Sequence, residues 1–166
     1  MPEDRMFQAV ELMDMAIQIE ERGRAFYAAC RSATNDTGLK EVFQYLMEQE
    51  VEHARVFSHM KEDLPQGRII LEDYPGELRN YLNAFVEGKV FEDPEAASGW
   101  NREINDPVEA VEAALEFEKA SILFYSGMKS LVRRSEGEVV DRVMAEEQSH
   151  VRRLLSFRRK MTGGKE

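Results

Sequence analysis

Apolar residues recur at alternating steps of three and four in several stretches, the spacing that lines one face of an α-helix. In the last stretch this apolar face is interrupted by one polar pair, Glu147 and His150. An earlier stretch repeats the pattern around Glu50 and His53. Burying a carboxylate and an imidazole is strongly unfavourable unless polar partners compensate. The pattern therefore predicts that both pairs meet polar partners inside the protein.

Two further stretches carry one glutamate each on an otherwise apolar face, Glu20 and Glu118, with Gly23 and Ser121 one turn later. The repeats are spaced almost equally, because 147 − 50 = 97 and 118 − 20 = 98. The sequence thus predicts a duplicated helical hairpin. We expect the two small residues to make room for ions or oxygen, although close helix packing would require them as well.

The pattern predicts an all-α chain with helices over residues 4–34, 38–63, 106–134 and 135–161. Short loops join the helices within each hairpin, 4–63 and 106–161, so each pair should be antiparallel. The crossover at 65–105 is long enough to return along the bundle. We therefore expect residues 1–166 to form a single domain, a four-helix bundle with one long crossover.

Local signals predict where the helices begin. Asp36 or Thr37 can cap the second helix, and Asp106 followed by Pro107 is a strong helix start. Ser135 to Glu138 has the spacing of a capping box for the last helix. Within the crossover, the apolar positions from Leu78 to Phe85 predict a short extra helix. Its apolar face could cover the bundle or form the surface of a homodimer, which we expect.

The composition excludes several classes of function. A net charge of −10 argues against nucleic acid as a partner. No apolar run approaches the ~20 residues that a membrane span needs. The single cysteine, Cys30, excludes an internal disulfide and a CxxC motif, which favours a reduced, cytoplasmic setting.

The buried polar residues together form a recognisable set of metal ligands. One glutamate from each of two helices, with Glu-x-x-His from each of the other two, is the ligand set of di-metal carboxylate bundles. Four carboxylates would balance the charge of two divalent ions, whereas without metal their repulsion and burial should raise some of their pKa values. The candidate ligands are Glu20, Glu50, His53, Glu118, Glu147 and His150.

The chain resembles the rubrerythrin-like branch of the ferritin-like superfamily over all four main helices. The motifs that carry the resemblance are Ile19-Glu20-Glu21 with Phe26-Tyr27, Glu50-Val51-Glu52-His53, Phe117-Glu118-Lys119-Ala120-Ser121 with Phe124-Tyr125, and Glu147-Gln148-Ser149-His150. The resemblance implies a ferritin-like bundle that binds two iron ions.

The same resemblance implies a role for each ligand. Glu50 and Glu147 would bridge the two ions, while Glu20 with His53, and Glu118 with His150, would complete the two ends. Rubrerythrins proper also carry a rubredoxin domain with four cysteines, which this sequence lacks. The electron donor would therefore be external, such as a rubredoxin-type protein.

Two tyrosines, Tyr27 and Tyr125, follow Glu20 and Glu118 by seven residues, which is two helical turns on the same face. They are either core side chains or groups that donate a hydrogen bond to a ligand.

The leading hypothesis is a di-iron oxidoreductase that reduces hydrogen peroxide or dioxygen, a peroxidase of oxidative-stress defence. The alternatives are a ferroxidase or iron-handling protein, and a metal-binding structural or sensory module without turnover. Manganese or zinc would fit the same ligands.

Overall fold

The computed structural model describes residues 9–64, 106–130 and 132–164. These residues form four helices, α1 (Ala9–Ala33), α2 (Thr37–Glu62), α4 (Pro107–Lys129) and α5 (Arg134–Met161). No strand occurs in these ranges, so the all-α prediction is confirmed.

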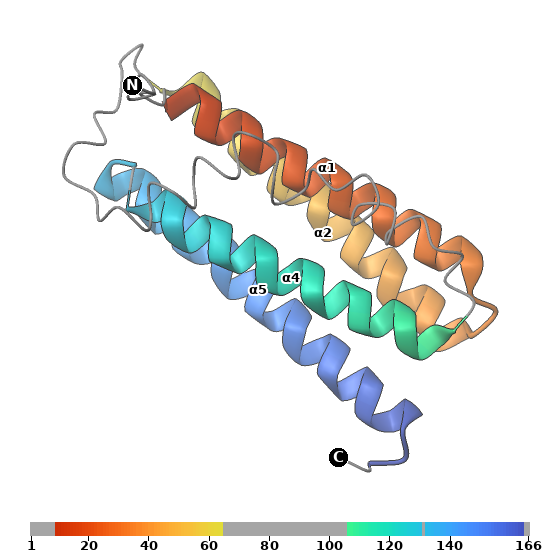
Figure 1. Cartoon of the computed structure of the whole chain (residues 1–166). Coiled ribbons are helices and arrows are strands. Elements are labelled where there is room, and N and C mark those ends of the chain that lie inside the picture. The colour runs from red at the N-terminus through yellow and green to blue at the C-terminus, as the bar shows by residue number, and fades with distance from the viewer. Residues whose placement is uncertain (1–8, 65–105, 131, 165–166) are drawn as a thin grey trace, which may run out of the picture.

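The helices form a bundle of two hairpins, as predicted (Figure 1). Helix α1 packs along α2 and α4 packs along α5, while α1 also contacts α4 and α2 contacts α5. None of the described helices is long and apolar enough to cross a membrane. The predicted extra helix and dimer surface within 65–105, and the predicted first turn before residue 9, lie outside the described residues.

Two helix starts follow the predicted chemistry. The Asp36 carboxylate accepts a hydrogen bond from the Leu39 backbone N–H at 2.7 Å, which caps α2. The Asp106 carboxylate accepts from the Val108 N–H at 2.9 Å, and Pro107 occupies the first position of α4.

The loop between α4 and α5 differs from the prediction. Helix α4 ends at Lys129 instead of 134, and the Ser130 N–H bonds back to Gly127. The predicted capping box at Ser135 and Glu138 is also wrong, because the capping residue is Arg133. The Glu136 carboxylate accepts from the Arg133 backbone N–H at 2.9 Å and also pairs with its guanidinium. These two contacts favour a helix that begins at Arg134.

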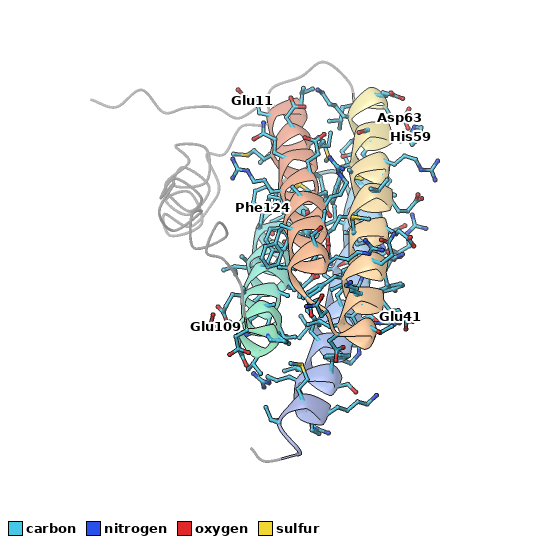
Figure 2. All side chains as sticks on the ribbon, turned by 90° about the vertical axis from the view of Figure 1, so that its right-hand side faces the viewer. Glu11, Glu41, His59, Asp63, Glu109 and Phe124 are labelled. Atoms are coloured by element: carbon cyan, nitrogen blue, oxygen red, sulfur yellow. The ribbon has the colours of Figure 1, made fainter. Side chains whose placement is uncertain are left out.

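The predicted apolar faces form the core between the helices. Leu39, Phe43 and Leu46 of α2 are fully buried, as are Val140 and Leu154 of α5. Figure 2 shows side chains of all four helices filling the space between them, whereas charged side chains such as Glu41 and Glu109 point outward. The two Glu and His pairs, and the single glutamates of the other two faces, are buried within this core.

Candidate metal centre

The six candidate ligands come together in the middle of the bundle. Helix α1 supplies one glutamate and α4 another, while α2 and α5 each supply a glutamate and a histidine. Each of the six side chains is at most 1% exposed, so none of them is a solvated surface group: Glu20, Glu50, His53, Glu118, Glu147 and His150.

The six residues form two overlapping groups, each of which could hold one metal ion. Within each group, one possible ligand atom from every residue lies within 4.8 Å of the others. Glu50 and Glu147 belong to both groups. The first group is completed by Glu20 and His53, and the second by Glu118 and His150.

Each imidazole turns its Nδ1 towards glutamates of its own group. His53 Nδ1 lies 3.0 Å from Glu147 Oε1 and 3.4 Å from Glu20 Oε2. His150 Nδ1 lies 2.9 Å from Glu147 Oε2 and 3.4 Å from Glu118 Oε1. The two rings are stacked with their centroids 5.7 Å apart. The geometry therefore repeats in the two halves, with Glu147 between the histidines.

Six buried polar atoms of this cluster have no hydrogen-bond partner among the described residues. Buried polar atoms without a partner are uncommon, and an ion that satisfies them is one physical explanation. Five of the six belong to the oxygens and Nδ1 atom that the side chains of the two groups offer, and they fit the oxygen and nitrogen donors that divalent iron, manganese or zinc accepts. These five are Glu20 Oε2, Glu50 Oε1, His53 Nδ1, Glu118 Oε2 and Glu147 Oε1, and the sixth is His150 Nε2.

The carboxylates of the cluster differ in the direction in which their pKa values are shifted. Burial, with the nearby carboxylates, raises the pKa of Glu50 and of Glu118 well above the ordinary value. Burial also acts to raise the pKa of Glu147, but the two neighbouring histidines outweigh it and lower that pKa. Without metal, the cluster therefore retains protons on some acids while Glu147 stays charged.

For the two histidines, burial and the neighbouring carboxylates shift the pKa in opposite directions. Burial alone would lower the pKa of His53, but the carboxylates of Glu147 and Glu20 raise it to about 11. The same balance, with Glu118 and Glu147, raises the pKa of His150 to about 9. In the metal-free cluster both histidines are therefore protonated and carry the positive charge. Metal ions that bind there would have to displace these protons.

Two tyrosines connect the hairpins through the cluster. The Tyr27 hydroxyl of α1 donates to Glu118 Oε1 of α4 at 2.5 Å, and the Tyr125 hydroxyl of α4 donates to Glu20 Oε1 of α1. Burial, and then the charge of the accepting glutamate, raises the pKa of both hydroxyls well above 10.0. Each tyrosine therefore remains a donor, fixing one oxygen of a glutamate and leaving the other free.

Gly23 makes room for a side chain of the cluster itself. A Cβ atom at this position would lie 2.6 Å from Glu50 Oε2 and 2.7 Å from Phe117 Cε1, both too close. The absence of a side chain at Gly23 is therefore what lets Glu50 reach the middle of the bundle. At the repeat-related position, the Ser121 hydroxyl bonds to the Phe117 carbonyl of its own helix.

One residue at the cluster was not among the predicted ligands. Glu146 Oε2 lies 2.7 Å from His53 Nε2, on the side of the ring that faces away from the other carboxylates. The sequence held a signal for it, because Glu146 directly precedes Glu147 and so flanks the apolar face of its helix. Its counterpart in the first repeat is Gln49, since 146 − 49 = 97.

Comparisons with known proteins bear on the fold and on the family. A solved structure from Thermotoga maritima, described as a ferritin-like diiron-carboxylate protein, superposes with a TM-score of 0.68. It shares 23% sequence identity, and the match covers 95% of this chain and 98% of that one, so it supports the ferritin-like fold. No curated protein sequence matches the chain.

The family model of rubrerythrin matches residues 11–158, which include every helix of the bundle except the ends of α1 and α5. The match spans the whole buried Glu and His cluster. The chain therefore belongs to the rubrerythrin family.

Proposed function

We propose that the chain is a di-iron oxidoreductase that reduces hydrogen peroxide or dioxygen. The observation that carries this proposal is the pair of buried ligand groups that share Glu50 and Glu147. Glu20 with His53, and Glu118 with His150, would complete the two ends of the centre. Four carboxylates and two neutral imidazoles balance the charge of two divalent ions.

Iron is proposed over zinc or manganese because the family and the structural relative point to a di-iron centre. An iron pair would supply two electrons, which with two protons convert one hydrogen peroxide to two waters, and an external reductant would replace those electrons. A rubredoxin-type protein has the chemistry required of that donor.

The protein side chains would prepare the site for this reaction. Tyr27 and Tyr125 hold the terminal glutamates in place, each from the opposite hairpin. The buried rings of Phe117 and Phe57 pack against Tyr27 and Tyr125, and would help to exclude bulk water from the neighbourhood of the cluster. The described residues offer no separate nucleophile at the cluster, so the six ligands would carry the chemistry.

The proposed setting is the reducing cytoplasm. Cys30 is a free, buried thiol, and burial raises its pKa to about 12, so it would remain an unreactive thiol there.

The test uses protein loaded with Fe(II) under anaerobic conditions and then given hydrogen peroxide. We expect each chain to consume about one peroxide for each pair of ferrous ions and to retain its iron through repeated cycles with a rubredoxin-type donor. The measurement combines the near-ultraviolet and visible absorption spectrum with iron analysis after gel filtration. Glu52→Gln, a change at an exposed position of the same helix as Glu50, serves as the matched control.

Three outcomes would contradict the proposal. Release of ferric iron after one cycle, or growth of a mineral, would indicate a ferroxidase. Binding of a redox-inert metal with no peroxide consumption would indicate a structural or sensory module. Peroxide consumption no faster than that of free Fe(II) would exclude catalysis by this centre.

A further inference from the structure

The two histidines differ on the side that faces away from the shared glutamates. His53 Nε2 of α2 lies 2.7 Å from Glu146 Oε2 of α5, within hydrogen-bond distance. The imidazole is 1% exposed, whereas the Glu146 side chain is 54% exposed. A carboxylate anchored at the surface thus reaches a histidine in the core.

Within the described helices, His150 has no such partner. Its Nε2 is buried and has no hydrogen-bond partner among the residues that the structure describes. The Tyr45 ring lies edge-on to the imidazole, with the centroids 5.9 Å apart. The repeat places Gln49 where the other half has Glu146, so an amide replaces the carboxylate. The two repeats therefore supply the same candidate ligands, but they differ in the group that contacts the outer nitrogen of each histidine.

A carboxylate behind a metal-binding histidine has two known physical effects. It accepts the proton of the outer ring nitrogen, which fixes the tautomer and the ring orientation, and it makes the inner nitrogen a stronger ligand. Loss of such a partner typically weakens metal binding by about 10–100-fold. In this chain the inner nitrogen is His53 Nδ1, which faces Glu20 and Glu147.

We propose that Glu146 is a positioning residue that makes the Glu20–His53 half of the centre bind its ion more tightly than the Glu118–His150 half. The inference rests on the proposed metal centre. It adds that the two ions bind with different affinities. The difference in affinity arises because position 146 is a glutamate whereas the related position 49 is a glutamine.

The experiment titrates the metal-free full-length chain with Zn(II) in a calorimeter, with a competing chelator and about 0.5 M salt to screen surface charge. Wild-type protein should bind two ions in steps separated by about 10–100-fold in affinity. Glu146→Gln should weaken the tighter step by a similar factor and leave the other unchanged. Gln49→Glu should strengthen the weaker step. Glu138→Gln, an exposed change on the same helix with the same loss of charge, should alter neither step.

A spectroscopic readout separates positioning from a general change in charge. The chain has three histidines, so nitrogen NMR of ¹⁵N-histidine-labelled, Zn(II)-loaded protein resolves each ring. His53 should carry its proton on Nε2 in slow exchange with water, and Glu146→Gln should make that proton exchange faster. The His150 signals should not change.

The results separate this inference from the proposal on which it rests. If wild-type protein binds fewer than two Zn(II) ions, the metal centre is wrong and this inference falls with it. If two ions bind but Glu146→Gln matches wild type, or weakens binding only as much as Glu138→Gln does, the inference alone is wrong. If the Gln49→Glu variant binds its weaker ion more tightly, the inference is supported even where Glu146→Gln disturbs the fold.

Discussion

Metal-free Glu118→Gln is expected to unfold at a higher temperature than metal-free wild type at pH 7, yet to lose most of the stabilisation that metal provides. The two effects have opposite signs because the same carboxylate is unfavourable in the metal-free core and, in the proposed centre, would bind the ion. A functional residue that lowers the stability of the fold is expected to behave in this way.

The sign of the metal-free effect follows from proton linkage. Burial raises the folded-state pKa of Glu118, so its contribution is favourable below the unfolded value of ~4.3 and is lost as pH rises through the folded-state pKa. Each pH unit in that window favours unfolding by up to about 1.4 kcal/mol. The glutamine side chain does not ionise, so it avoids this cost, and its carbonyl oxygen can still accept the hydrogen bond from Tyr27. We expect a gain of about 2 kcal/mol at pH 7, or about 4–8 °C in Tm.

The loaded protein should show the reverse. A ligand at 100 times its Kd stabilises the folded state by about 2.7 kcal/mol for each site, and an amide is a poor replacement for a terminal carboxylate. The measurement is a set of four melting curves, wild type and variant, each with chelator and with anaerobic Fe(II). If the metal-free variant melts below wild type, or if Fe(II) stabilises both proteins equally, Glu118 is not a buried ligand.

Metal-free wild type is also expected to lose stability as pH rises from about 6.5 to 9. The folded-state pKa of His53 is raised to about 11 and that of His150 to about 9, against an unfolded value of ~6.5. A raised pKa gives stability that is complete below the unfolded value and is lost as pH rises through the folded value. Glu147, whose pKa is lowered, loses its contribution only at acidic pH, outside this window. The expected loss is on the order of 3 kcal/mol for each of the two histidines.

Urea unfolding with chelator at several pH values measures this slope. His53→Gln should reduce it, whereas His59→Gln, whose side chain is 64% exposed, should leave it unchanged. Metal should reverse the trend, since ions replace the protons and bind better as pH rises. A flat or rising stability of the metal-free wild type across this range would show that the histidines are not held among carboxylates.

The sequence was most informative where periodicity and chemistry coincide. The apolar faces of α2 and α5 predicted both the helices and the burial of Glu50 and His53, because a three-four repeat leaves only one face for the core. The nearly constant offset between repeats then predicted which helices would place their glutamates together. The buried cluster follows from these two regularities.

Interactions that depend on side-chain direction could not be predicted in the same way. The cap of α5 depends on Glu136 reaching back to Arg133, in competition with an equally plausible Ser135 box. Gly23 was expected to make room for ions or oxygen, but only the packed bundle shows the Glu50 carboxylate beside it. Glu146 is exposed in part, and periodicity carries little information about groups at the edge of a buried face.

Anomalous diffraction at the iron edge, from crystals loaded anaerobically with Fe(II), would locate the ions that the six proposed ligands hold. Two peaks per chain are expected inside the bundle. One peak should contact Glu20 and His53, the other Glu118 and His150, and both should contact Glu50 and Glu147. A single peak, or iron bound only at the surface, would show that these residues do not hold an iron pair.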